Sequence, residues 1–130
     1  MPPPAEIELI VTPDGADFIA QVNIAGVTGL KGSQIDFHFG GKEVKVKGIA
    51  DGLISGNPMP ALAQRFIGGS DKFLRVLSNL PPATVVNGAG ILVKVRFQPI
   101  LPGQPIVNMA KISLFNIEGK KIPHHRSGQP

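Results

Sequence analysis

The segment Ser33-Gln34-Ile35-Asp36-Phe37-His38-Phe39 carries the cleanest alternation of apolar and polar residues in the chain. Successive side chains of a β-strand point to opposite faces, so residues two apart share a face. The apolar set is Ile35, Phe37 and Phe39, and the polar set is Gln34, Asp36 and His38. The segment therefore predicts a strand with one face in a hydrophobic core and the other in solvent.

Shorter alternating runs lie on both sides of this segment, at residues 6–11, 18–24, 44–49, 73–77, 91–97 and 110–115. A strand is also favoured over one helical turn for residues 61–67. Turn signals such as Thr12-Pro13-Asp14-Gly15 and Asn87-Gly88 separate the runs. Roughly nine short strands without a long helix are typical of an all-β sandwich. Its expected core is Ile7, Leu9, Val22, Ile24, Ile35, Phe37, Phe39, Val93, Val95 and Phe97.

The composition fits this fold class and excludes several functions. The chain has 130 residues, which is the size of one domain, and its 16 Gly and 13 Pro suit short strands joined by tight turns. It has no Cys, which excludes a disulfide scaffold, a thiol nucleophile and a cysteine-ligated metal. All seven aromatic residues are Phe, whereas a sugar-binding platform usually needs Tyr or Trp. The net charge of +4 comes from scattered bases, which is not the footprint of a nucleic-acid surface.

Catalytic and cofactor motifs are lacking. His38 is the only histidine on an expected strand, and no histidine pair on such a strand has metal-ligand spacing. Gly88-Ala89-Gly90 opens a strand rather than a helix, and no Ser or Thr follows Gly40-Gly41-Lys42, so neither is a phosphate-binding loop. We therefore expect no enzymatic activity, no cofactor, no metal site and no catalytic residue.

The two ends of the chain read as linkers. Residues 1–4 are Met followed by three prolines, and residues 124–130 are rich in His, Gly and Pro. No run of 18 apolar residues is present, so no membrane-spanning helix is expected. The expected organisation is a linker stub at 1–4, a β-sandwich at 5–123 and a linker or tail at 124–130.

Five stretches, in this order, resemble the cohesin domain family, whose members bind dockerin modules and so assemble cellulosomes. They are AQVNIAGV (20–27), GLKGSQIDFHF (29–39), VKGIADGLISG (46–56), GILVKVRF (90–97) and ISLFNIEGKKIP (112–123). The likeness spans residues 5–123. It implies a nine-stranded jelly-roll sandwich of two antiparallel sheets. It further implies a non-catalytic scaffolding or adhesion module, excised from a larger extracellular or cell-surface protein.

The resemblance also implies a protein partner, a dockerin-type module that itself carries calcium. In cohesins the partner binds the sheet built from strands 8, 3, 6 and 5. Residues 90–97 resemble strand eight of the family, so the resemblance implies that the outward residues of this strand and of residues 33–39 form one mixed-charge patch. The implied partner-binding residues are Gln34, Asp36, His38, Arg75, Leu77, Leu92, Lys94 and Arg96. Asp36 is expected to pair with Lys94 or Arg96.

Two other functions remain open on the sequence. One is a carbohydrate-binding module of similar sandwich architecture, which would need exposed Tyr or Trp. The other is a purely structural domain of a secreted surface protein, which would bind no partner. The partner's identity, the parent protein, the oligomeric state and the targeting signal are not encoded in recognisable motifs.

Overall fold

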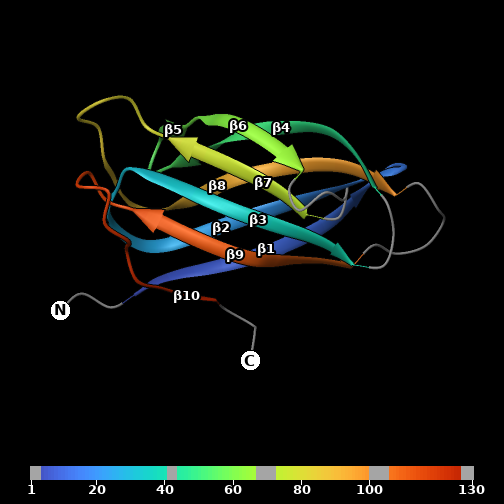
Figure 1. The fold of residues 1–130 in the computed structure, drawn as a ribbon, viewed down its shortest axis with the longest axis horizontal. Helices are drawn as coiled ribbons and strands as arrows, with labels where there is room; N and C mark the ends of the chain where they lie inside the picture. Colours follow the sequence, from blue (N-terminus) through green and yellow to red (C-terminus); the bar gives the residue numbers. More distant parts are fainter. Residues whose placement is uncertain (1–3, 41–43, 67–72, 100–105, 127–130) are drawn as a thin grey trace.

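The computed structural model describes residues 4–40, 44–66, 73–99 and 106–126, which form ten strands and no helix. Figure 1 shows the strands running along the long axis of the molecule. They are β1 (Ala5–Asp14), β2 (Asp17–Leu30), β3 (Gly32–Gly40), β4 (Val44–Ile54), β5 (Asn57–Met59), β6 (Ala61–Phe66), β7 (Phe73–Asn79), β8 (Val86–Pro99), β9 (Ile106–Phe115) and β10 (His124–Arg126). The predicted all-β class is confirmed. The described residues form one strand more than the expected nine, and two of the ten, β5 and β10, are only three residues long.

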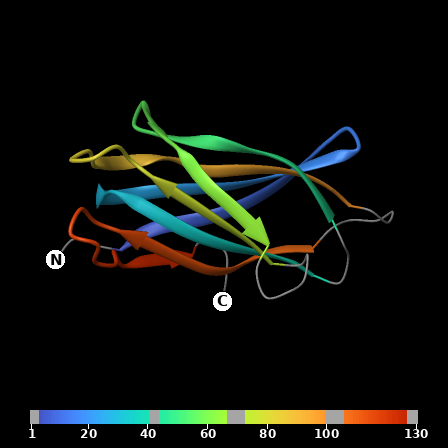
Figure 2. The ribbon, with the colours of Figure 1, turned by 45° about the horizontal axis from the view of Figure 1, so that its top comes forward.

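The strands form two sheets that pack face to face. The large sheet has the order β10-β1-β2-β8-β4-β5, and the small sheet has the order β6-β7-β3-β9. Neighbours are antiparallel except for the pair β1 and β10. In Figure 2 the small sheet crosses in front of the large one. This arrangement confirms the predicted jelly-roll sandwich.

The inward-facing side chains of both sheets form one aliphatic core with a phenylalanine cluster. Phe37, Phe39 and Phe97 are fully buried, and the Phe97 ring lies 5.1 Å from the Phe39 ring and 5.9 Å from that of Phe18. Nine of the ten predicted core residues are buried, and Leu9 packs against the cluster at its edge. The alternation in the sequence therefore gave the inward face of these strands correctly.

Glycines allow β4 and β8 to approach closely. A Cβ atom on Gly52 would lie 2.1 Å from the carbonyl oxygen of Ile91, and one on Gly90 would lie 2.0 Å from that of Leu53. Real Cβ atoms do not approach backbone oxygen so closely, so larger residues would push the strands apart. The β4–β5 turn is attached to the same region, because the Ser55 hydroxyl donates to the carbonyl of Asn87 at 2.6 Å.

The C-terminal boundary differs from the expectation. His124–Arg126, assigned to a linker or tail, form β10 and pair in parallel with the start of β1. Arg126 also donates a hydrogen bond to the carbonyl oxygen of Met109 on β9, so it links the large sheet to the small one. An open β1 edge offers backbone donors and acceptors to any extended segment, which composition alone does not reveal. Residues 1–3 and 127–130 lie outside the described residues.

Candidate functional site

The predicted partner-binding residues belong to two different sheets of the sandwich. β3 lies between β7 and β9 in the small sheet, whereas β8 lies between β2 and β4 in the large sheet. The expectation of one patch built from residues 34–38 and 92–96 is therefore wrong. Alternation identifies the outward residues of a strand, but it does not identify the neighbouring strand. The strand that completes the sheet beside β3 is β9, which begins at Ile106.

We call the outward residues of β3, β7 and β9, together with Leu62 and Ile117, the small-sheet face. An ion pair lies at its centre. Arg75 donates from Nε and Nη2 to the two carboxylate oxygens of Asp36, at 2.9 and 3.0 Å. Asp36 is only 5% exposed, and its hydrogen bonds raise the pKa of Arg75 above the ordinary value. Lys111 of β9 lies opposite Asp36 on the other side.

Two further rows of side chains flank this ion pair. His38 stacks on Phe73, with ring centroids 4.5 Å apart and an angle of 21° between the rings. Gln34 lies between Leu77 on β7 and Ser113 on β9. The structure therefore brings together five of the eight predicted residues: Gln34, Asp36, His38, Arg75 and Leu77.

One end of the small-sheet face contains an apolar hollow of about 440 Å³. Gly32, which pairs with Asn79 on β7 and with Phe115 on β9, is part of its lining. The side chains of Leu62, Leu77 and Ile117 line it and are 64%, 39% and 56% exposed. Large apolar side chains exposed together in this way are typical of interaction sites. Polar residues lie around them: Lys31, Asn79 and Asn116.

Four residues of this face are not among the predicted ones: Leu62, Asn108, Lys111 and Ile117. The sequence predicts a strand at residues 110–115, but the resemblance to cohesins implies that residues 90–97 are the neighbour of β3. The alternation of Lys111 and Ser113 with Ile112 and Leu114 was the available signal for an outward-facing lysine. Leu62 and Ile117 lie at a register shift and after the end of β9, where alternation gives no signal.

The other three predicted residues belong to the large sheet. Leu92 was expected to face outward but is fully buried, because the register of β8 against β2 shifts between Val22 and Asn23 and turns Leu92 inward. Lys94 and Arg96 do face outward, on the side of the sandwich away from Asp36. We call the outward residues of β1, β2, β8 and β4 the large-sheet face.

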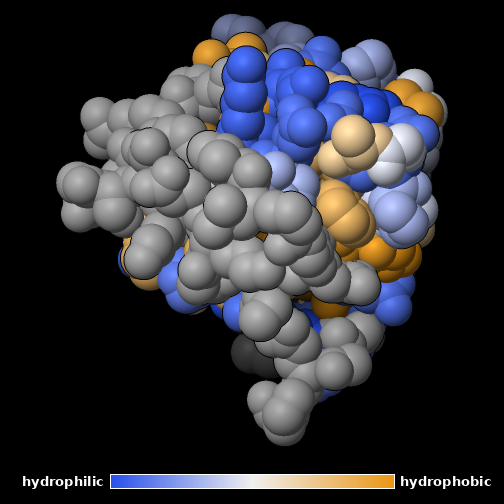
Figure 3. All heavy atoms as spheres, turned by 90° about the vertical axis from the view of Figure 1, so that its right-hand side faces the viewer, coloured by the Kyte–Doolittle hydropathy of each residue, from blue (hydrophilic) through white to orange (hydrophobic). Residues whose placement is uncertain are grey.

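Arg96 pairs with the β1–β2 turn rather than with Asp36. Its guanidinium donates to Asp14 at 2.6 Å and to Asp17 at 3.2 Å, and Lys47 lies 3.8 Å from Asp17. The hydrogen bonds to Asp14 and Asp17 raise the pKa of Arg96. In Figure 3, which views the right-hand end of Figure 1, hydrophilic residues gather on the upper side of that end. The expected pairing of Asp36 with Lys94 or Arg96 is therefore wrong.

The described ranges contain no group of three metal-ligating side chains close enough to hold an ion. Within them there is also no helix that is long and apolar enough to cross a membrane.

Solved structures similar to this chain include cohesins. A non-cellulosomal cohesin from Archaeoglobus fulgidus has a TM-score of 0.70 and 16% identity, covering 95% of this chain and 86% of the other. A type II cohesin domain from the cellulosome of Acetivibrio cellulolyticus also gives 0.70, with 14% identity over 95% and 92%. A chain of a type I cohesin–dockerin complex from Clostridium thermocellum gives 0.73, with 15% identity over 95% and 94%.

No protein-family model matches the sequence, and no curated protein is similar enough to count as a match. The structural likeness covers nearly the whole chain at low identity, so it shows that the chain has a cohesin-like fold. The resemblance seen in five stretches of the sequence is confirmed at this level.

Proposed function

We propose that this domain is a non-catalytic protein-binding module that binds a dockerin-type partner through the small-sheet face. The observation that carries the proposal is the apolar hollow beside Gly32, which lies on the sheet that contains β3. The resemblance to cohesins implies that this sheet binds the partner. A similar solved structure comes from a cohesin–dockerin complex, which supports the class of partner.

Binding would combine an apolar anchor with charges around it. Leu62, Leu77 and Ile117 lose exposed apolar surface when a partner side chain enters the hollow, which is the main source of affinity. Lys111 is exposed and carries a positive charge near the centre of the face, so it favours a partner with an acidic residue there. The ion pair of Asp36 and Arg75 holds the middle of the face in a fixed conformation.

The proposed interface differs from the one expected from the sequence. Gln34, Asp36, His38, Arg75 and Leu77 remain in the proposed interface, and Leu62, Asn108, Lys111 and Ile117 join it. Leu92, Lys94 and Arg96 leave it, because they belong to the other sheet. The partner would carry the calcium in its own loops, and the site here needs none. One of the similar solved structures is a cohesin domain from the cellulosome of Acetivibrio cellulolyticus. On this likeness we propose that the domain belongs to an extracellular or cell-surface scaffold.

The test is a binding titration of single variants against a panel of calcium-loaded type I and type II dockerin modules. Leu77→Asp and Ile117→Asp each place a charge in the apolar hollow and should weaken binding at least about tenfold. Leu53→Asp is the matched control, because Leu53 is 51% exposed but lies on β4 of the large sheet. Circular dichroism checks that each variant folds.

Two outcomes would contradict the proposal. If the wild-type domain binds no member of the panel, the purely structural function is favoured. If Leu53→Asp weakens binding as much as Leu77→Asp, the partner does not dock on the small-sheet face.

A further inference from the structure

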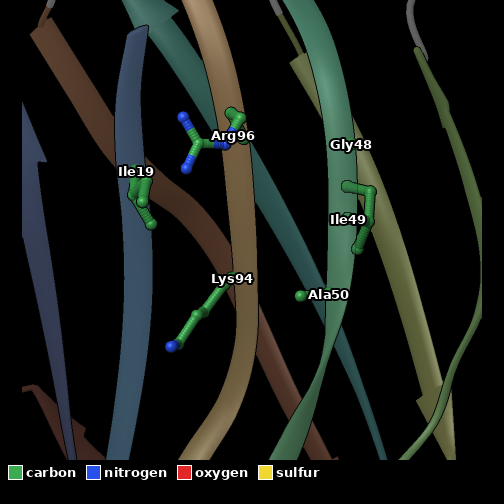
Figure 4. Close-up of a pocket in the computed structure, with 6 residues that line it drawn as sticks. All are labelled: Ile19, Gly48, Ile49, Ala50, Lys94 and Arg96. Atoms are coloured by element: carbon green, nitrogen blue, oxygen red, sulfur yellow. The ribbon is translucent and has the colours of Figure 1, made fainter. Parts of the chain in front are cut away.

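The large-sheet face has a hollow of its own, distant from the proposed partner site. It has a volume of about 340 Å³, which is within the range of small-molecule sites. Figure 4 shows that β2, β8 and β4 contribute its lining, with the two cationic side chains on the middle strand. The lining residues are Ile19, Gly48, Ile49, Ala50, Lys94 and Arg96.

Small residues on β4 create the space. Gly48 lies opposite Arg96, directly after a register shift between Val46 and Gly48. A Cβ atom added to Gly48 would find no atom within 4 Å. Ala50 lies opposite Lys94 and extends only a methyl group. Gly48 and Ala50, two outward positions of β4, therefore leave this side of β8 uncovered, and the half-buried side chain of Ile19 makes the hollow partly apolar.

The charges around the hollow are not balanced. Arg96 is hydrogen-bonded to Asp14 and Asp17, so its charge is already compensated. Lys94 is half-buried, and in the described part of the chain its ammonium has neither a carboxylate partner nor a hydrogen-bond acceptor. An unpaired cation at a partly enclosed site attracts an anion placed beside it.

We propose that this hollow binds a small aliphatic carboxylate, with the carboxylate on Lys94 and the aliphatic body in the space beside Gly48. The acid supplies a negative charge beside Lys94, and its methylene groups cover Ile19 and the methyl group of Ala50. Neither half of the ligand suffices: the charge selects a carboxylate, and the apolar space selects one with several carbons. This site does not depend on the small-sheet face, which lies on the other side of the sandwich.

The test uses sodium hexanoate as the probe, titrated into the isotope-labelled domain while amide chemical shifts are recorded. Hexanoate should cause saturable shifts at Ile19, Ile49 and Lys94. Acetate and hexanol are the matched probes for charge alone and apolar body alone, and both should bind at least about fivefold more weakly, since each lacks one half of the interaction.

Two variants locate the site. Lys94→Gln removes the charge and leaves a polar side chain that is one atom shorter, and should weaken hexanoate binding at least about fivefold. Gly48→Val fills the hollow, where the structure leaves room for it, and should abolish binding. Ala50→Val is a second filling variant for the same purpose. The matched controls are Lys111→Gln on the small sheet and Thr28→Val elsewhere on β2, and both should bind hexanoate as the wild type does.

Three results would overturn the proposal. Equal binding of hexanol would show that the charge plays no part, and equal binding of acetate would show the same for the apolar space. Shifts that persist in folded Gly48→Val and Ala50→Val would place the ligand elsewhere. The dockerin titration tests the other sheet, so a failure of hexanoate to bind would not affect the proposed dockerin site.

Discussion

The two outer faces of the sandwich share a hollow and an arginine–aspartate ion pair but differ in which side chains are exposed. Each has a hollow beside a glycine, Gly32 on the small sheet and Gly48 on the large one, and each has an arginine paired with aspartate. On the small-sheet face the carboxylate of Asp36 is buried and the apolar side chains around the hollow are exposed. On the large-sheet face the apolar side chains are half-buried and a cation remains unpaired. The first arrangement suits a protein partner, and the second suits a small anion.

The largest expected change in the free energy of unfolding tests whether the two sheets share one core. Phe37 projects inward from the small sheet and Phe97 from the large sheet, and both are fully buried. Phe37→Ala and Phe97→Ala should each lower the free energy of unfolding by about 3–5 kcal/mol, because each deletes a large core side chain. Chemical denaturation measures this. A loss below about 1 kcal/mol for either variant would mean that the sheets are more independent than the shared core indicates.

The next effect compares two glycines of β4. Gly52→Ala should cost about 1–3 kcal/mol, because its Cβ would collide with the backbone of β8. Gly48→Ala should instead raise stability by about 0.5–1 kcal/mol, because the site is open and glycine is unfavourable within a strand. Thermal unfolding of the two variants side by side gives the difference. An equal loss of thermal stability in Gly48→Ala and Gly52→Ala would argue against an open hollow at Gly48.

The ion pairs of the two faces should respond differently to salt. Asp14→Asn removes a carboxylate that is 55% exposed, so its effect on the melting temperature should disappear at about 1 M NaCl, where the screening length is about 3 Å. Asp36→Asn leaves Arg75 beside a buried neutral group, and its destabilisation should persist at high salt. If both effects vanish together, the ion pair at the centre of the small-sheet face is as solvated as the exposed one.

The smallest effect concerns the edge strand β10, which belongs to neither face. Burial lowers the pKa of His124, and the charge of Arg126 lowers it further. Between this lowered pKa and the ordinary value of about 6.5 the unfolded chain binds more protons than the folded domain. Stability should therefore decline as the pH falls below about 6.5 and level off below the folded-state pKa.

The measurement is the melting temperature of the wild type and of His124→Gln between pH 7 and pH 5. The difference between the two curves isolates His124 from the other histidines. A wild-type curve parallel to that of the variant would show that His124 is not held in the β1–β10 edge.

The sequence predicted which side chains of a single strand face inward, but it did not predict which strands lie side by side. The alternation from Gln34 to Phe39 gave the correct inward and outward faces, because the side-chain period of a strand is local. It could not show that β9, rather than β8, lies beside β3, because pairing between distant segments leaves no local pattern. Leu92 was misplaced for a related reason: one extra residue at a register shift turns a side chain to the other face.

The parallel pairing of β10 with β1 has a mechanical consequence. Ala5 lies beside His124, and Ile7 beside Arg126, so the two strands run in the same direction where the chain enters and leaves the sandwich. A tension applied to the segments before Ala5 and after Arg126 pulls these strands in opposite directions along their length. The backbone hydrogen bonds between them are then loaded together, in shear, instead of being opened one after another. Stretched between neighbouring parts of a longer chain, the domain would resist extension first at this edge, and the small-sheet face would remain outside the line of force.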